Sequence, residues 1–504
     1  MPVARPSETI VDRTPLTTGR VDVGSRIGWL LRSHRVLAGV GLASMSRRLA
    51  DVGVPRGVSA LSGLERRGDR NGRIIDGYEQ ALELAPGSLR APIDMLCRNL
   101  RDAPVDDEPS TPPPVDLREF DAVVEPLWSG SPSGGEWLRW ARVLASAGRW
   151  GLPTRVVEPL VAELLHEMVR SVGPAFATRY VALTTLRRSD YGGVVEDAVR
   201  SLVATPGTEP FAVNALTIAV EEPTPQVVAW VASLLSHPSE WVVTGASYSL
   251  QTLRVVDALD EETWAVVGRE VVRAHRAATG GSATSRALTT LLRTLPATER
   301  REVQQRLDRP VDAVPGPASW TADETNVHYA TCVDLAARAV ERTGGEAQPM
   351  LARLFFEAVY DFRTPVSEIG AKSLMASPYI LAAQDCLMEL ALEADDAASR
   401  QGAVRALVRC QVPGREQQVE EWLPRVDTDA VPAAFTVAAN AGIAVPDAHL
   451  AAVDGPDEDV SLRVLEWVGM AGGPALAGLV ETATRPVVRA GARWWLDHPG
   501  RVVL

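Results

Sequence analysis

The residues best suited to contact a ligand are arginines and serines in the stretch VPRGVSALSGLERRGDR, from Val54 to Arg70. Arginine can donate two parallel hydrogen bonds to guanine or to a phosphate group, and serine is a small donor that fits into a groove of DNA. Between Val21 and Ile74, ten arginines stand against four acids, which gives this segment a formal charge of +6 and leaves −19 for the rest of a chain whose net charge is −13. A basic segment attached to an acidic body predicts a local contact with nucleic acid.

A second group with possible chemistry is the segment ELLHEM, where Glu163 and Glu167 flank His166. Metal sites in proteins use three or four ligands, and this segment supplies one histidine with no second one beside it, so we interpret it as a surface helix. The sequence contains no G-x-x-x-x-G-K phosphate loop, and the segments PGSL and GEWL do not resemble a nucleophile elbow. We therefore predict that the protein is not an enzyme and has no catalytic residue, bound metal or cofactor.

The elements that would position the arginines are five short helices separated by turns rich in glycine and proline. Apolar residues recur at helical spacing from Ile27, and Ser88 is a candidate N-cap of the last helix. We expect helices over Ile27–Ala38, Ser44–Val52, Gly57–Arg66, Ile74–Leu84 and from Ser88 to Leu96.

The third of these helices is predicted to bury an apolar stripe of Val58, Leu61 and Leu64 and to present its other face to DNA. The predicted base-reading residues are Arg56, Ser59, Ser62, Gly63, Arg66 and Arg67. The predicted phosphate contacts are Ser44, Ser46, Arg47, Arg48, Arg70 and Arg73. The alternative interpretation is that these arginines only keep an exposed face soluble.

Several short motifs in this segment occur in the order found in a known family. They are Ile27-Gly28, Leu31-Arg32, Gly41-Leu42, Leu49-Ala50, Gly53-Val54, Leu64-Glu65, Gly68 and YEQALELAPGSL from Tyr78 to Leu89. Residues 24–97 resemble the lambda-repressor-like (Cro/cI, or Xre-type) helix-turn-helix domain, with Ser46 at the position of the family's usual glutamine and small differences of spacing around the third helix. The resemblance implies that the third helix enters the major groove of double-stranded DNA.

Beyond this segment a domain boundary is predicted at residues 101–115, RDAPVDDEPSTPPPV, which contain five prolines and four acids. We predict a disordered arm at residues 1–23, a DNA-binding domain at 24–98, a linker at 99–117 and a helical body at 118–504. The four cysteines, Cys97, Cys332, Cys386 and Cys410, are widely spaced, which predicts buried free thiols in a reducing compartment.

The body repeats a Gly-Ala pair that is followed, four residues after the alanine, by a large apolar residue. We expect the small pair to let a second helix approach closely and the residue four places on to lie on the same packed face. The copies are Trp241–Leu250, Val366–Met375, Ala398–Leu407 and Pro486–Leu496, with weaker ones centred on Ala215, Ala287 and Ala330. The segments EADDAASRQGAVRAL and TRPVVRAGARWWL resemble HEAT-type repeats, with Arg400 and Arg489 three residues before the small packing residue. The pattern predicts an α-solenoid of HEAT-like helical hairpins. The alternative is an irregular helical domain in which the Gly-Ala pairs are coincidental.

The HEAT resemblance raises one enzyme class, the HEAT-like DNA-repair glycosylases, because Trp137, Trp140 and Trp150 could stack on a base. We disfavour this class, since tryptophans at helical spacing are usually buried and an acidic body has the wrong charge for gripping DNA.

Together these features predict an all-α protein with an N-terminal five-helix helix-turn-helix domain and a C-terminal α-solenoid. We expect a cytoplasmic, bacterial, nucleoid-associated transcriptional regulator that binds a double-stranded DNA operator as a homodimer and does not contact a membrane. The acidic body would serve for dimerisation or would hold a protein or small-molecule ligand in its groove. The main alternative is a helical-repeat scaffold or adaptor, such as an antitoxin or phage-defence component, whose N-terminal domain serves for tethering or autoregulation.

Overall fold

The computed structural model describes residues 9–18, 20–68, 71–100, 116–128, 130–146, 151–255, 258–314 and 320–503. Within these ranges the regular structure is helical, and the β-type pairing is limited to one isolated parallel bridge between Ser171 and Val502. The predicted all-α class is therefore confirmed. None of the helices in the described ranges combines the length and the apolar character that crossing a membrane requires.

The chain divides into two compact units, each built from two separate stretches of sequence. The first unit contains residues 1–111 and 316–437, and the second contains residues 112–315 and 438–504. This division differs from the predicted domain boundaries, because part of the expected body joins the N-terminal helices in one unit. The helices α5 and α6 end and begin at the margins of the predicted linker 99–117, and residues 101–115 of that linker lie outside the described residues.

The helices of the first unit are α1 (Val23–Leu37), α2 (Leu42–Asp51), α3 (Val58–Arg67), α4 (Gly72–Ala81), α5 (Arg90–Asn99), α17 (Ala322–Thr343), α18 (Pro349–Tyr360), α19 (Thr364–Met375), α20 (Ile380–Glu393), α21 (Ala397–Cys410) and α22 (Glu416–Trp422), with 3-10 turns at Leu423–Arg425 and Thr428–Ala430. Helix α23 (Val431–Ala441) crosses from the first unit into the second.

The helices of the second unit are α6 (Leu117–Trp128), α7 (Gly134–Ala145), α8 (Thr154–Arg170), α9 (Pro174–Arg187), α10 (Gly192–Ala204), α11 (Ala212–Ala219), α12 (Pro225–Ser233), α13 (Glu240–Val255), α14 (Glu261–Ala277), α15 (Ala283–Thr294), α16 (Ala297–Gln305), α24 (Asp447–Leu450), α25 (Glu458–Met470), α26 (Ala475–Thr482) and α27 (Pro486–Asp497), with 3-10 turns at Glu209–Phe211 and Leu234–Ser236.

Many of these helices begin where a short polar side chain accepts a hydrogen bond from the first turn, as expected for N-caps. The residues that do so are Asp22, Asn71, Ser133, Thr224, Asp260, Ser282, Thr321, Asp396 and Asp457. Ser133 and Glu136 form a complete capping box at the start of α7. Local sequence therefore determines the start of these helices.

The predicted N-cap Ser88 is wrong, because α5 begins after Leu89 and no side chain of its own segment caps it. The carboxylate of Glu79 on α4 instead accepts hydrogen bonds from the backbone N–H groups of Gly87, Leu89 and Arg90, each at 2.7 Å. These bonds satisfy N–H groups that a helix leaves unpaired at its start. The cap is thus supplied from the preceding helix.

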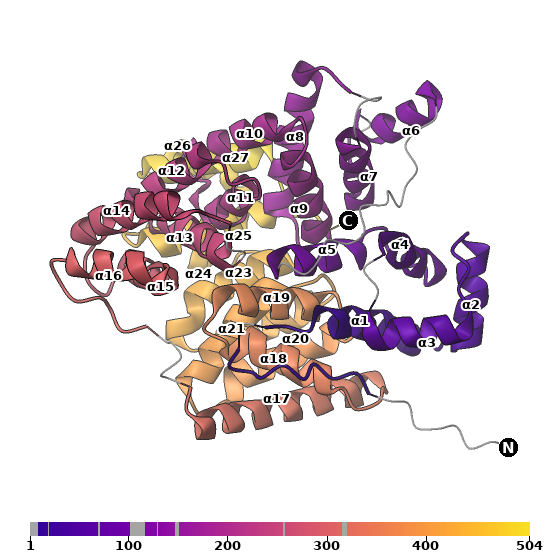
Figure 1. Ribbon diagram of the computed structural model, residues 1–504. Helices are drawn as coiled ribbons and strands as arrows, with labels where there is room; N and C mark the ends of the chain where they lie inside the picture. Colours follow the sequence, from indigo (N-terminus) through magenta and orange to yellow (C-terminus); the bar gives the residue numbers. More distant parts are fainter. Residues whose placement is uncertain are drawn as a thin grey trace. The chain divides into compact units, whose positions relative to one another are not determined.

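The first unit has a layer of helices in which α18 is central. Helix α18 contacts α17, α19 and α21, and α20 contacts α17 and α21 (Figure 1). Helix α5 also packs on α19, so the N-terminal helices and the 316–437 stretch share one core.

The segment before α1 packs against α18 instead of forming the predicted disordered arm. Ile10 and Asp12 are buried, and Asp12 accepts a hydrogen bond from the Arg26 guanidinium at 3.1 Å. The backbone carbonyl of Thr14 accepts from Arg353 on α18. Figure 1 shows this indigo segment lying along the orange helices before it enters α1. The prediction failed for residues 9–18 and 20–22 because their partners lie far away in the sequence; residues 1–8 and 19 lie outside the described residues.

In the second unit, helices contact their second neighbours along the chain. Helices α7, α9, α11, α13 and α15 form one series of such contacts. In addition α8 contacts α10, α12 contacts α14, and α14 contacts α16. Consecutive helices α8 and α9, α10 and α11, α12 and α13, and α14 and α15 also pack together. The last residues of the chain return to this unit, where Val502 and Val172 share a backbone hydrogen bond of 2.9 Å.

The predicted Gly-Ala pairs lie on helices at points of close backbone approach. A Cβ atom added at these glycines would come within 3.0 Å of another segment, and the positions are Gly245, Gly370, Gly402 and Gly491. The large residues four places after the alanines are buried at Leu250, Met375 and Leu407. Leu496 is 45% exposed, so the prediction is wrong there, because Trp494 and Trp495 fill the core beside it.

The weaker copies of this repeat behave less regularly. Ala215 is fully buried on α11, Ala287 is half-buried on α15, and Ala330 is exposed on α17. Ala330 therefore does not act as a packing residue. The cysteines are buried free thiols, as predicted, at Cys97, Cys332, Cys386 and Cys410.

Candidate nucleic-acid interface

Within the described residues, the predicted DNA-binding residues lie on α2, on α3, in the turn between them and, for Arg73, on α4. Helix α3 packs on α1 and on α2, and α2 packs on α4. The five N-terminal helices begin and end within a few residues of the predicted ranges, although α1 starts at Val23 and not at Ile27. Gly53 has a positive φ of 77° in the turn between α2 and α3, a conformation that glycine adopts without strain.

Helix α3 lies very close to α1, which explains two glycines of the motif. A Cβ added to Gly28 would lie 2.3 Å from the backbone oxygen of Glu65, and one added to Gly68 would lie 2.1 Å from the oxygen of Gly24. Gly68 also has a φ of 69°. The helices reach this spacing because neither position carries a side chain.

A buried polar network fixes the orientation of α3. The guanidinium of Arg35 on α1 donates two hydrogen bonds of 2.6 Å to the carboxylate of Glu65, and the hydroxyl of Tyr78 on α4 donates a third at 3.0 Å. Burial disfavours the charged guanidinium, yet the hydrogen bonds and charge of Glu65 hold the pKa of Arg35 above its usual value. Burial, followed by the charge of Glu65, raises the pKa of Tyr78. Three helices therefore share one satisfied polar cluster.

The buried face of α3 differs from the predicted stripe by one position. Leu61 and Leu64 are buried as expected, but Val58 is 45% exposed, and Glu65 is buried in its place. Val58 and Glu65 lie two turns apart on the same side of α3, so the difference is one of position along the helix. The Arg35–Glu65 pair holds the C-terminal end of α3 against α1, whereas Val58 is the first residue of the helix and stays exposed at its N-terminal end.

The structure describes where each predicted base-reading residue lies. Ser59, Arg66 and Arg67 are exposed, and Arg56, Ser62 and Gly63 are half-buried. The guanidinium of Arg66 bonds the backbone oxygen of Ser62 at 3.2 Å, one turn earlier on the same helix. Ser59, Gly63 and Arg66 follow the helical spacing of one face, so these side chains share the outer side of α3.

The predicted phosphate contacts divide into exposed and structural residues. Arg47, Arg48 and Arg73 are exposed, and Ser44 is half-buried. The Ser46 hydroxyl donates to the backbone oxygen of Arg56 at 2.5 Å, which ties α2 to the turn before α3. Arg48 donates to the oxygen of Ala81 at 3.0 Å, and Arg73 donates to the oxygen of Gly53 at 3.1 Å. Arg70 lies outside the described residues.

The basic surface is smaller than the sequence count suggested, because three arginines of the segment form ion pairs within the first unit. Arg26 pairs with Asp12 and Glu357, Arg32 lies 3.6 Å from Glu346, and Arg35 pairs with Glu65. The pairs of Arg26 with Glu357 and of Arg32 with Glu346 could not be predicted, because each joins residues more than three hundred positions apart.

Two of the three tryptophans that suggested a DNA-repair glycosylase lie in the described residues, and neither is exposed for stacking. Trp137 and Trp140 are buried on α7, and the Trp137 indole N–H donates to the Glu167 carboxylate at 2.9 Å. The same carboxylate accepts a 2.7 Å hydrogen bond from Arg179. Trp150 lies outside the described residues.

No family model and no curated protein matches this sequence. Among solved structures, the chain is similar to an engineered protein at 16% identity, over 72% of this chain and 98% of that one, with a TM-score of 0.19. A likeness this weak supports no statement about fold or function.

Proposed function

We propose that the N-terminal helices bind double-stranded DNA and that the protein is a sequence-specific transcriptional regulator. The observation that carries this proposal is the outer face of α3, where Ser59, Arg66 and Arg67 are exposed, beside an exposed Arg47 on α2. A single helix with small and arginine side chains fits the major groove, and arginine is the commonest reader of guanine.

The buried side of the same helices suits this task, because a reading helix must be held in a fixed orientation. The Arg35–Glu65–Tyr78 cluster and the close α1–α3 contact at Gly28 hold α3 from behind. In the proposed complex α3 reads bases and the exposed Arg47 neutralises a phosphate. Ser46 acts indirectly, since its hydroxyl anchors the turn.

For the rest of the chain we propose a HEAT-like helical solenoid that provides dimerisation or binds a protein or small-molecule ligand. The contacts between second-neighbour helices in the second unit support a solenoid. The arginine of the HEAT resemblance, Arg400 on α21, also supports it. Its guanidinium donates to the oxygens of Ala394 and Asp395, at 2.7 and 3.0 Å, in the turn before α21 and pairs with Asp427 at 2.6 Å. A homodimer would bind two half-sites spaced by about 34 Å, one turn of DNA.

The proposal is tested by genome-wide occupancy of the full-length protein, followed by selection of bound sequences from random duplex DNA. We expect a few sharp sites that share a two-fold symmetric motif, and the purified chain should select the same motif. Diffuse occupancy without an enriched motif would contradict sequence-specific regulation.

The second candidate function is a scaffold or adaptor. It is favoured by the arginines of the N-terminal helices that form ion pairs within the protein and are not free to contact DNA. Arg26 and Arg35 are buried in ion pairs, so part of the positive charge of the N-terminal helices is neutralised inside the protein. An adaptor would co-purify with one protein in a fixed ratio and would show no motif in the selection. The occupancy experiment therefore separates the two functions.

A further inference from the structure

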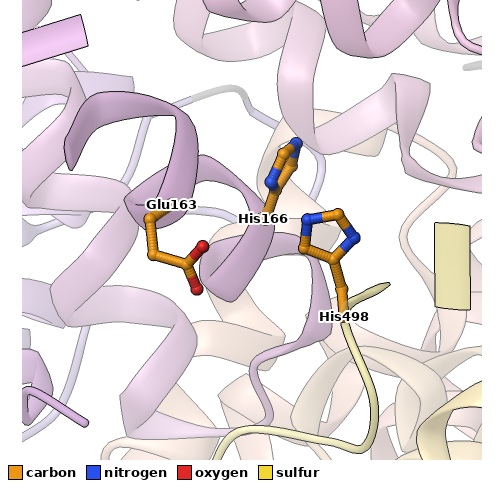
Figure 2. Close-up of side chains that lie close together, drawn as sticks. All are labelled: Glu163, His166 and His498. Carbon is orange, nitrogen blue, oxygen red and sulfur yellow. The ribbon is translucent and has the colours of Figure 1, made fainter. Parts of the chain in front are cut away.

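Two histidines and a glutamate converge in the second unit, away from the proposed DNA-reading helices in sequence. Glu163 and His166 lie one turn apart on α8, and His498 follows the end of α27. One ligand atom from each residue lies within 4.8 Å of the others. Figure 2 shows the two imidazole rings side by side and tilted against each other, with the Glu163 carboxylate on the same side of α8.

The end of the chain is attached to α8 by several contacts, which keep His498 at this position. The backbone N–H of Val502 donates to the oxygen of Arg170 at 2.9 Å. The guanidinium of Arg170 donates to the oxygens of Pro499 and Gly500, both at 3.1 Å. The return of His498 to α8 is therefore part of the packing of this unit.

Aromatic packing and one hydrogen bond orient the histidine rings. The ring centres of His166 and His498 are 4.1 Å apart, and His498 stacks on Trp494 at 4.6 Å. The Nδ1 atom of His498 lies 2.8 Å from the backbone oxygen of Trp494. A carbonyl oxygen can only accept, so Nδ1 carries the proton and Nε2 keeps a free lone pair. Metal-binding histidines are usually held this way, by a backbone carbonyl behind the ring.

We propose that Glu163, His166 and His498 form a binding site for a divalent transition-metal ion. Two imidazoles and one carboxylate are the three protein ligands found at zinc sites that keep an open position, and at mononuclear iron sites. Ligand atoms around a tetrahedral ion lie about 3.4 Å apart, as follows from metal–ligand distances of about 2.1 Å. The exposed Glu163 side chain can close this remaining distance by rotating, because its ion-pair contact within the described residues is a long one, 3.8 Å to Arg170.

The positive charge of Arg170 is the main feature that opposes a cation here. Its guanidinium is already satisfied by the oxygens of His166, Pro499 and Gly500, so it does not depend on Glu163 for a partner. Its nearby charge lowers the affinity for a metal without blocking the ligand atoms. We therefore expect Arg170→Gln to strengthen metal binding if the fold is kept.

The site would link the end of the chain to α8, so metal binding should also stabilise the second unit. The test uses the full-length chain without a histidine tag, freed of metal by a chelator and titrated with Co²⁺, followed by competition with Zn²⁺. We expect visible d–d absorption that saturates at one Co²⁺ per chain, displacement by Zn²⁺ and a rise in melting temperature with Zn²⁺.

Three ligand variants and one control distinguish this site from other histidines. Glu163→Gln, His166→Gln and His498→Gln should each weaken Co²⁺ binding by at least about tenfold, the lower range found for losing even a supporting residue of a metal site. His237→Gln, in the same unit but outside the cluster, should bind like the wild type. Because Glu163 is exposed, its variant should fold normally. Absence of saturable Co²⁺ and Zn²⁺ binding by the wild type, or unchanged binding by folded Glu163→Gln and His498→Gln, would overturn the proposal.

Discussion

The buried ion pair between α1 and α18 gives a quantitative prediction for the first unit. The Arg26 side chain is 0% exposed, and its guanidinium donates to both Glu357 oxygens, at 2.6 and 2.8 Å, and to Asp12 at 3.1 Å. Replacing Arg26 by methionine keeps much of its length but leaves two buried carboxylates. Glu357 would retain only Arg353, at 2.9 Å, as an ion-pair partner.

We expect Arg26→Met to destabilise the first unit by about 3–5 kcal/mol, the usual cost of removing one partner of a buried ion pair. Since 1.4 kcal/mol is a factor of ten, local opening of α1 should increase by roughly a hundredfold or more. Hydrogen–deuterium exchange of peptides from α1 and from residues 9–18 measures this opening, and urea unfolding followed by circular dichroism measures the stability.

Two variants make this test specific. Arg32→Met on the same helix removes a pair with the exposed Glu346 and should cost less than about 1 kcal/mol. Adding Asp12→Asn to Arg26→Met removes the buried carboxylate that has lost its guanidinium, while Glu357 still pairs with Arg353, and should restore part of the lost stability. A loss below about 1 kcal/mol for Arg26→Met, or no recovery in the double variant, would refute this explanation of how α1 is held.

Three further predictions concern the N-terminal helices. Gly28→Ala should destabilise them by about 1–3 kcal/mol in urea unfolding, because the added Cβ would lie 2.3 Å from the backbone oxygen of Glu65. The control is Gly193→Ala, whose added Cβ would have no atom within 4 Å and which should be neutral or stabilising. Burial lowers the pKa of His34 below its ordinary value of 6.5. As the pH falls, the unfolded chain therefore binds a proton at this histidine before the folded chain does. The first unit should lose stability as the pH falls below 6.5. Urea midpoints at several pH values should fall less for His34→Gln than for the wild type, and equal falls would contradict the assignment. Arg47→Ala should reduce the salt slope of DNA binding by about 1 with little change in sequence preference, measured by titrations at several salt concentrations.

The sequence predicted local structure well because helices depend on spacing, caps and turns within a few residues. The ranges of α2 and α3 agree with the prediction to within two residues. The Gly-Ala pairs were correctly predicted to lie at close helix contacts, since a small side chain has this consequence wherever a second helix packs. The exposed Ala330 shows that the same pattern without a packed neighbour has no such meaning.

Features made by distant residues could not be predicted in this way. Val58 fits the apolar stripe of α3, but it is the first residue of the helix and stays exposed, and the burial of Glu65 depends on its pairing with Arg35 on α1. Asp12 belongs to a polar, unpatterned stretch, and its burial depends on Arg26 and on α18. The histidine missing from the ELLHEM segment is His498, which only the returning end of the chain brings to His166.

The most direct test of the proposed function is the affinity of the full-length chain for its selected duplex, measured by fluorescence anisotropy at fixed salt for the wild type, Arg66→Ala, Arg67→Ala and a control, Arg301→Ala. The proposal predicts that one or both α3 variants lose about 1–3 kcal/mol of binding free energy and relax the preference at one base position. The exposed Arg301 on α16 should have no effect. Unchanged affinity in both α3 variants would contradict the central claim that this helix reads DNA.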